Sequence, residues 1–254
     1  EFFLKMKERK IILIIQARND SKRFPKKVLA KINGKPLLWH IIERSKQIKH
    51  DKIVVATTKR KIDNEIINVA KKCKVDYFRG SKNNVLDRFY LAAVKFEADI
   101  IIRITADCPL IDPGISNKII KKFLKGNLDY VATDEKTFPK GTDTECFSFD
   151  SLKRAHNEAK LKSEHEHVTP YIWKNTQKFK IHILINKRKE PYRLVVDYKN
   201  DLVLIKKIYA ELYKNNRIFS IEDVIKVLKR RPDLIKINQN HDPYEGYVIS
   251  LKKD

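Results

Sequence analysis

A short apolar strand that leads straight into a cationic loop is the feature that most constrains the fold of this chain. Residues 11–15 are all Ile or Leu, which is typical of a strand buried on both faces. The polar loop that follows is interrupted by Pro25 and holds five cations: Arg18, Lys22, Arg23, Lys26 and Lys27. Open α/β sheets bind phosphates just beyond the carboxyl ends of their strands. We therefore expect this loop to bind phosphate groups.

Strand and helix patterns alternate along the first hundred residues. Further strands are predicted at 52–57, 75–78 and 99–104, and helices at 36–49, 64–73 and 85–96. Alternation at this spacing indicates βαβ crossovers and a mainly parallel sheet. Neither a GxGxxG nor a GxxxxGK[ST] motif is present, which disfavours classical dinucleotide and P-loop sites.

The second half of the chain departs from this alternation. A helix at 115–124 and a strand at 130–133 precede an alternating pattern at 142–149, which suggests an antiparallel strand. Two His and two Glu at 164–167 lie ahead of a short helix. Further strands are expected at 180–185 and 193–196, and helices at 151–160, 202–215 and 221–229, the last capped by Ser220.

No linker or internal repeat divides the chain, so one domain is the simplest organisation. We predict a single domain over residues 6–254. Within it, residues 138–186 form an insertion for substrate binding or dimerisation. The first five residues precede the only methionine and are left out of this domain.

The formal net charge of +23 raises the question of a nucleic-acid partner. Most of the 55 cations are lysines, however, and they are spread over the whole length without a long basic run. We therefore do not expect nucleic acid to be the partner, although a basic nucleic-acid-binding protein stays open as an alternative. The same positive field favours a small polyanionic substrate such as a nucleoside triphosphate.

The cysteines and the apolar runs bear on the location of the protein. Cys73, Cys108 and Cys146 lie far apart without a CxxC pair, which disfavours structural zinc and a disulfide framework and suits a reducing cytoplasm. No apolar run approaches the ~20 residues of a membrane helix. We expect a cytoplasmic protein that is not inserted in a membrane.

A second polar signal lies at Asp107, directly after the strand predicted at 99–104. Carboxyl ends of parallel strands meet at one edge of the sheet, so Asp107 is expected near Arg18. A carboxylate that faces a cationic loop suits a Mg²⁺-bound triphosphate. The alternative is that Asp107 only caps the following turn.

Eight motifs occur in the order seen in the cytidylyltransferase-like family named for spore-coat polysaccharide biosynthesis. They are QARNDSKRFPKKVL, GKPLLWHIIER, VVATT, FRGSKNNVLDRFYLAA, RITADCPLIDP, FPKGTDTECFSF, EHVTPYIW and VVDYKND. The chain resembles this family over residues 11–238 and, more distantly, the CMP-ketodeoxyoctonate and CMP-sialic acid synthetases. The resemblance implies a three-layer α/β/α, Rossmann-like nucleotide-diphospho-sugar transferase fold with a mainly parallel sheet and a small antiparallel insertion. It also implies CTP as a substrate, Mg²⁺ as the cofactor and a homodimer.

The resemblance singles out residues for nucleotide binding. In the loop these are Gln16, Ala17, Arg18, Ser21, Arg23 and Lys27, and for the base or ribose they are Arg79, Asp87 and Arg88. Arg18, Arg23 and Lys27, together with Asp107, are the implied catalytic residues. The loop departs from the family at Asp20 and Lys26, where glycines are usual, so contacts through the backbone are expected less than contacts through side chains.

The resemblance also assigns the acidic positions. Asp107 and Asp197 would share the metal, although Asp197 could instead cap the next helix, for which Asp201 is an equally good candidate. Asp143, Glu145 and His167 would bind the sugar. From the pattern alone, Asp143 and Glu145 could also hold a second metal or a lysine, or lie on an exposed strand face.

These assignments predict in-line nucleotidyl transfer, in which a sugar oxygen attacks the α-phosphorus of CTP and pyrophosphate leaves. The product would be a CMP-sugar for surface polysaccharide or glycan synthesis. The main alternative is a glycosyltransferase on a related fold, which would consume a finished nucleotide-sugar. Such enzymes usually have a DxD pair, and the sequence after Asp107 lacks the second Asp. Release of pyrophosphate separates the two activities.

Overall fold

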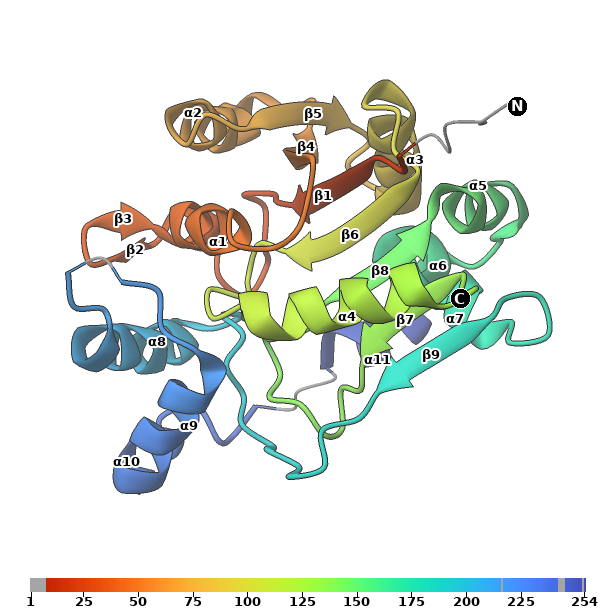
Figure 1. Cartoon of the computed structure of the whole chain (residues 1–254). Coiled ribbons are helices and arrows are strands. Elements are labelled where there is room, and N and C mark those ends of the chain that lie inside the picture. Colours follow the sequence, from red (N-terminus) through yellow and green to blue (C-terminus); the bar gives the residue numbers. More distant parts are fainter. Residues whose placement is uncertain (1–7, 216, 242–244, 253) are drawn as a thin grey trace.

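A seven-stranded sheet forms the centre of the computed structural model, which describes residues 8–215, 217–241, 245–252 and 254 (Figure 1). Its strands follow the order β5-β4-β1-β6-β8-β7-β9. Their bounds are β1 Ile11–Gln16, β4 Lys52–Thr58, β5 Asp76–Gly80, β6 Ile100–Thr105, β7 Tyr130–Thr133, β8 Glu145–Ser148 and β9 Ile181–Leu184. Neighbouring strands are parallel except at β8, which runs antiparallel to both β6 and β7. A separate antiparallel pair is formed by β2 (Lys31–Ile32) and β3 (Lys35–Pro36).

Helices cover both faces of this sheet (Figure 1). On one face pack α1 Leu37–Ser45, α2 Asn64–Lys72, α4 Pro113–Lys125, α8 Lys199–Leu212 and α9 Ile221–Arg230. On the other pack α3 Val85–Lys95, α5 Phe149–Glu158 and α7 Pro170–Lys174. The remaining elements are the 3₁₀ turns η1 Lys27–Leu29 and η2 Lys61–Asp63, and the helices α6 Lys162–His167, α10 Pro232–Ile235 and α11 Glu245–Leu251.

Burial on two faces explains the apolar run of β1. Leu13 packs into the core beneath α1 and α8, whereas Ile12 and Ile14 face the core beneath α3. The predicted three-layer α/β/α fold with a mainly parallel sheet is therefore confirmed.

Two local predictions change in the structure. Residues 193–196 were predicted as a strand, but they make only an isolated bridge between Lys140 and Arg193. The N–H of Leu194 donates to the carbonyl of Lys140, whereas that of Val196 donates to the carbonyl of Asp107, so the pairing does not continue. The acidic and His-rich stretch expected before a short helix is itself helical, as α6. By contrast, the antiparallel strand predicted at 142–149 is confirmed with the narrower bounds of β8, and Ser220 caps α9 as predicted.

The predicted insertion at 138–186 contributes directly to the central sheet. Its strand β8 lies between β6 and β7, and its strand β9 extends the sheet beyond β7. The predicted start of the domain at residue 6 lies outside the described residues.

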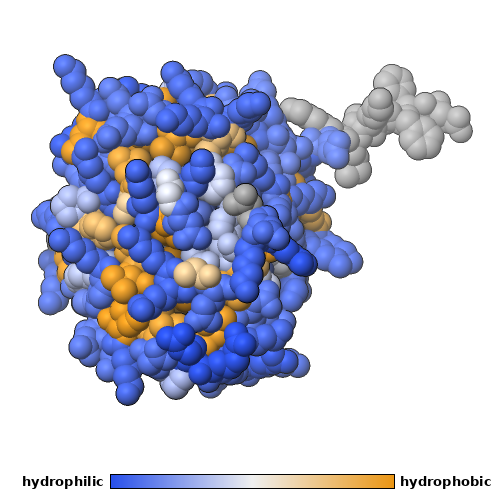
Figure 2. Space-filling model, turned by 90° about the vertical axis from the view of Figure 1, so that its left-hand side faces the viewer, coloured by the Kyte–Doolittle hydropathy of each residue, from blue (hydrophilic) through white to orange (hydrophobic). Residues whose placement is uncertain are grey.

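The surface agrees with the dispersed charge of the sequence. Figure 2 shows hydrophilic side chains spread over one whole face of the molecule, with apolar atoms exposed between them. Within the described ranges, no helix has the length and apolar character needed to cross a bilayer. The three cysteines are buried and form no disulfide.

Candidate active site

The loop after β1 is closed on itself and anchored to its neighbours. The backbone N–H of Ala17 donates to the carbonyl of Ala56 on β4 at 3.1 Å. The backbone N–H of Asn19 donates to the Asp63 carboxylate at 2.8 Å. The N–H of Lys26 then returns to the carbonyl of Asn19 at 2.8 Å and closes the loop. The segment between these two residues is therefore held at the carboxyl end of β1.

This closed loop presents a row of backbone donors. Across the described part of the chain, the N–H groups of residues 20–24 donate to no protein acceptor. Unpaired peptide N–H groups in a turn conformation can bind anions where they converge. The replacement of two glycines by Asp20 and Lys26 disfavoured backbone contacts with phosphate. The unpaired N–H groups show that the backbone of this loop nevertheless has donors available for such contacts.

The two non-glycine positions are accommodated in different ways. Lys26 has a φ of 56°, the left-handed conformation that glycine adopts most readily, and its ammonium pairs with Glu65 at the surface at 2.9 Å. The carboxylate of Asp20 accepts from Arg60 at 2.5 Å and from Lys82 at 3.0 Å. Burial favours a higher pKa for Asp20, but the bond from Lys82 and the nearby cations hold it below the ordinary value. Its negative charge is therefore neutralised locally.

Asp107 and Asp197 meet at one lysine. The N–H of Val196 donates to the carbonyl of Asp107 at 2.8 Å, which brings two segments distant in sequence side by side. The Lys27 Nζ then donates to Asp107 Oδ2 and to Asp197 Oδ1, each at 2.8 Å. Burial opposes the charge of Lys27, yet the two carboxylates raise its pKa. Burial likewise opposes the charge of Asp107, and Lys27 lowers its pKa well below the ordinary range.

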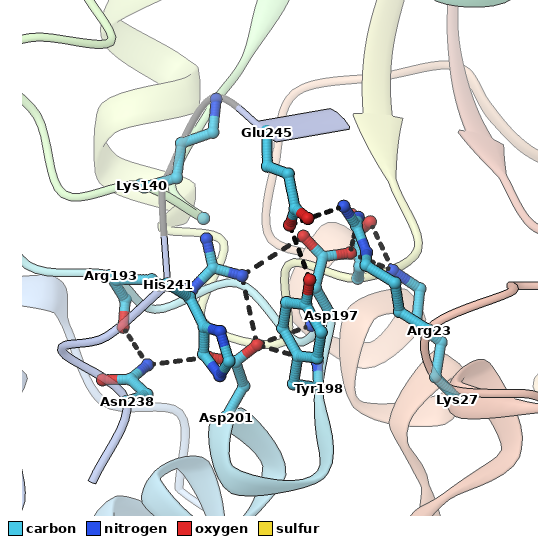
Figure 3. Close-up of polar contacts among 12 residues, drawn as sticks. Arg23, Lys27, Lys140, Arg193, Asp197, Tyr198, Asp201, Asn238, His241 and Glu245 are labelled. Carbon is cyan, nitrogen blue, oxygen red and sulfur yellow. Dashed lines mark hydrogen bonds and ion pairs between the residues drawn. The ribbon is translucent and has the colours of Figure 1, made fainter. Parts of the chain in front are cut away.

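A neighbouring carboxylate leaves Asp197 available for this contact. Asp201, at the start of α8, accepts from the backbone N–H groups of Asp197 and Tyr198, both at 2.9 Å, and so provides the helix cap. Arg193 contacts Asp197 Oδ2 at 3.3 Å and Asp201 Oδ1 at 3.1 Å. Figure 3 shows Asp197 with Arg23 and Lys27 on one side and Arg193 on the other. Capping by Asp197, one of the two alternatives, is therefore excluded.

Arg23 connects this centre to the end of the chain. It pairs with Asp197 at 2.8 Å and with Glu245 of α11 at 3.2 Å. The hydroxyl of Tyr198 also donates to Glu245 at 2.6 Å, and the guanidinium of Arg23 lies over the Tyr198 ring (Figure 3). Sequence reasoning missed Arg193, Tyr198 and Glu245. Tyr198 follows Asp197 within a quoted motif, but no local pattern marks Glu245.

Arg18 lies between Asp20 of its own loop and α6. Its Nη2 lies 4.0 Å from the Glu166 carboxylate and its Nε 3.7 Å from Asp20. Arg88 is buried close by and donates to the carbonyl of Ser81 at 2.6 Å, but its Nε has no partner. Burial, helped by the charge of Arg18, lowers the pKa of Arg88 to about 10. An unpaired donor on a buried guanidinium is suited to a nucleotide.

Three of the other residues predicted to contact nucleotide, Arg79, Asp87 and Gln16, have protein partners. Arg79 donates to the carbonyls of Thr58 and Arg60, and Asp87 accepts from His156. Gln16 accepts from Arg103 at 3.1 Å, Ala17 is buried, and Ser21 is half-buried in the loop.

Glu145 lies in a fully bonded network inside the sheet. It pairs with Arg103 across the β6–β8 register and accepts from Tyr130 and Thr169, each at 2.7 Å. Burial favours a higher pKa for Glu145, but Arg103 lowers it below the ordinary value. Asp143 accepts from the Gly141 N–H at 3.1 Å, and its Oδ1 is buried without a partner. Because both carboxylates are largely enclosed, an exposed strand face is excluded.

His167 is the third residue predicted to contact the sugar. It ends α6, and its Nε2 is buried without a hydrogen-bond partner in the described structure. Burial and the nearby charge of Arg103 lower its pKa to about 4, so the imidazole is neutral at pH 7.

Of the described carboxylates, those of Asp107 and Asp197 are the two that contact Lys27. Among the described residues, no group of three or more His, Cys, Asp or Glu side chains is arranged to hold a metal. Asp107 and Asp197 nevertheless fit such an ion, because one ammonium contacts both carboxylates. Any further ligands would have to come from substrate or water oxygens, as Mg²⁺ commonly allows.

Solved structures of nucleotidyltransferases share this architecture. A cytidylyltransferase from Leptospira borgpetersenii serovar Hardjo-bovis superimposes with a TM-score of 0.86 at 34% identity, covering 92% of this chain and 99% of that one. CMP:2-keto-3-deoxy-manno-octonic acid synthetase in complex with CTP gives a TM-score of 0.62 at 18% identity, covering 80% of this chain and 99% of that one. The second likeness concerns the fold alone.

Relatives by sequence agree with these structures. An uncharacterized protein of Methanocaldococcus jannaschii is 40% identical, over 91% of this chain and 95% of its own. The spore coat polysaccharide biosynthesis protein SpsF of Bacillus subtilis is 31% identical, over 88% of this chain and 95% of its own. The 3-deoxy-manno-octulosonate cytidylyltransferase of Trichlorobacter lovleyi is 36% identical over 45% of each chain.

The sequence pattern of one family spans most of the chain. The family described as cytidylyltransferase matches residues 12–230, which include the loop after β1, Asp107 and Asp197. The resemblance inferred from the motifs is confirmed. The chain belongs to the cytidylyltransferase family of nucleotidyltransferases.

Proposed function

We propose that the protein transfers the cytidylyl group of CTP to a sugar or sugar acid, giving a CMP-sugar and pyrophosphate for surface polysaccharide or glycan synthesis. The observation that carries this proposal is the meeting of Lys27 with Asp107 and Asp197 at the carboxyl edge of the sheet. These contacts lie next to the loop after β1, in which the N–H groups of residues 20–24 donate to no acceptor in the described part of the chain. Membership of the cytidylyltransferase family supports the choice of nucleotide.

The protein's part in this reaction is mainly positioning and neutralisation of charge. A hydroxyl oxygen of the sugar attacks the α-phosphorus of CTP and loses its proton to water, and pyrophosphate leaves, which gives the CMP-sugar. Attack by the phosphate oxygen of a sugar phosphate would release pyrophosphate in the same way but would give a CDP-sugar. Arg18, Arg23 and Lys27 neutralise the charge on the leaving group, while the N–H groups of residues 20–24 orient it. Arg23 and Lys27 exchange their present carboxylate partners for phosphate oxygens as CTP enters.

Mg²⁺ is the cofactor that we propose for the carboxylates released in this exchange. Asp107 and Asp197 would hold it, because they already share one cationic partner and the pKa of Asp107 lies well below neutrality. When bound, such an ion supplies positive charge to the phosphate oxygens that it contacts.

The other predicted residues keep their roles in this proposal. Arg79, Asp87 and Arg88 are assigned to the base or ribose, and Asp143, Glu145 and His167 to the sugar. We further propose a cytoplasmic homodimer that uses residues 138–186. Sedimentation velocity over a range of concentrations tests the dimer.

Thermal-shift measurements with CTP, UTP, GTP and ATP, each with Mg²⁺, test the nucleotide. Stabilisation grows as RT ln(1 + [L]/Kd), so CTP is expected to raise the melting temperature most. Pyrophosphate release on adding a sugar acid then tests the transfer itself. Equal responses to all four nucleotides would contradict the assignment to CTP.

The glycosyltransferase alternative makes a different prediction. Such an enzyme would consume a nucleotide-sugar and would release no pyrophosphate from CTP. Turnover of a CMP-sugar in the absence of CTP, without any pyrophosphate, would favour that activity over the proposed one.

A further inference from the structure

The C-terminal helix α11 bridges the two sides of the candidate active site. At its first residue, Glu245 pairs with Arg23 of the phosphate loop at 3.2 Å. Near its end, the Ser250 hydroxyl donates to Glu166 of α6 at 3.1 Å. Beyond it, Asp254 accepts from the backbone N–H of Ser163 at 2.7 Å. This helix lies past residue 230, where the family match ends.

Tyr247 lies in the middle of this bridge and faces His167. The two rings meet edge to face, with centroids 5.2 Å apart, and the Trp173 ring lies 6.0 Å from Tyr247 on another side. The Tyr247 hydroxyl and the His167 Nε2 are both buried, and neither has a hydrogen-bond partner in the described structure. Native proteins seldom leave buried polar atoms unpaired, so two of them in adjacent side chains point to a missing ligand.

These atoms belong to the side of the site that lies next to Glu145. The charges of Arg103 and Glu145 both act on His167, and Glu145 accepts from Thr169, two residues after His167. Asp143, also predicted to contact the sugar, contributes a third buried polar atom without a hydrogen-bond partner, its Oδ1.

The chemistry of the unpaired atoms indicates what they bind. A phenol hydroxyl donates and accepts, a neutral imidazole nitrogen does one or the other, and a carboxylate accepts. The two largely enclosed cations beside them are already paired, Arg103 with Glu145 and Lys140 with Glu135 and Asp143. The set therefore matches the hydroxyl groups of a sugar better than it matches an anionic group.

We propose that Tyr247, together with His167, binds hydroxyl groups of the sugar substrate, so that α11 forms one wall of the sugar subsite. The proposal rests on the proposed function and adds to it a sugar-binding residue beyond residue 230, where the family match ends. Because both polar atoms are enclosed, the proposal requires α11 to move when the sugar enters.

The test removes one oxygen atom from the protein. Tyr247→Phe is assayed by pyrophosphate release with CTP, Mg²⁺ and three probes: ketodeoxyoctonate, N-acetylneuraminate and a hexose 1-phosphate. We expect the KM of the accepted sugar to rise on the order of tenfold, while the KM of CTP and the melting temperature stay unchanged. His167→Asn, which removes Nε2, is expected to raise the same KM.

Tyr213→Phe is the matched control. It also deletes a phenol hydroxyl, but its ring packs against His40 and Tyr209 at the end of α8. We expect it to leave both KM values as in the wild type. A higher sugar KM in Tyr247→Phe but not in Tyr213→Phe, at an unchanged melting temperature, supports a contact with the sugar. A loss of packing would lower the melting temperature instead.

Three results would overturn the inference. One is an unchanged sugar KM in both Tyr247→Phe and His167→Asn. Another is a wild-type protein that CTP stabilises but that responds to none of the three sugars, in which case nucleotide binding stands and the hydroxyl subsite does not. The third is a protein that CTP does not stabilise, and then the proposed function fails as well. The CTP measurement thus separates the two failures.

Discussion

Two clusters of charge at the active site are built in opposite ways. The phosphate-side cluster consists of Arg23, Lys27, Asp107, Asp197 and Glu245, and the sugar-side cluster consists of Arg103, Tyr130, Glu145 and Thr169. In the first, cations from a loop contact carboxylates from three other segments, and we propose that CTP replaces the contacts of Arg23 and Lys27. In the second, one carboxylate inside the sheet has three protein donors. The contrast indicates that ion pairs of the same kind can have different roles. Those of the loop are available to a charged ligand under the proposed function, whereas the Arg103–Glu145 pair stabilises the sheet.

The largest effect is expected from Glu145→Gln in the sugar-side cluster. It leaves the Arg103 guanidinium buried without its counterion, so we expect a loss of about 3 kcal/mol in the free energy of unfolding. Urea denaturation measures it. Glu158→Gln is the control, because Glu158 also accepts from an Arg, a Lys and a Tyr but lies at the surface, where the loss should be much smaller. Equal losses in the two variants would remove the proposed difference between the clusters.

Asp107→Asn addresses the phosphate-side cluster. We expect kcat/KM for CTP to fall on the order of 10²-fold, because the variant lacks one of the two carboxylates proposed to hold the cation that neutralises the reacting phosphates. Asp76→Asn, which alters an exposed pair with Lys52, should leave the pyrophosphate-release rate unchanged. Near-full turnover of Asp107→Asn with Mg²⁺ would show that the metal assignment is wrong.

The pH dependence of the melting temperature tests whether the His167 imidazole is buried and neutral in the folded protein. The pKa of His167 is lowered from 6.5 to about 4 in the folded protein. Between these values the unfolded chain binds a proton that the folded protein does not, so the stability contributed at this position falls as the pH falls. We expect the melting temperature of the wild type to decrease relative to that of His167→Asn between pH 7 and pH 5. A constant difference would mean that His167 titrates alike in both states.

The smallest effect is expected from Glu245→Gln. Its carboxylate competes with phosphate for Arg23, so its neutralisation should tighten CTP binding a few-fold, within the range of a partly exposed ion pair. Isothermal titration with CTP and Mg²⁺ measures the change. Glu65→Gln, which alters the surface pair with Lys26 of the same loop, is the control. Weaker binding of CTP by Glu245→Gln would show that Glu245 orients Arg23 rather than competing for it.

The amino-acid sequence determined the layers of the fold and the edge at which the site lies. Residues 11–15 had to be buried on both faces, and the alternation of patterns required parallel crossovers. Parallel strands place their carboxyl ends at one edge, so Asp107 could be expected beside the phosphate loop. Helix capping at Ser220 was also predictable, because a cap depends only on residues within one turn.

Tertiary structure alone decided which charges meet. From the sequence, Asp197 and Asp201 were equal candidates for the helix cap. In the structure, the hydrogen bond from Val196 to Asp107 places Asp197 beside Lys27, and Asp201 accepts from the backbone at the start of α8. Arg103 finds Glu145 because β8 enters the sheet beside β6, an order that no local pattern records. The return of α11 to the phosphate loop follows the same rule. Contacts between residues distant in sequence depend on the order of packed elements, whereas propensity and periodicity act within a few residues.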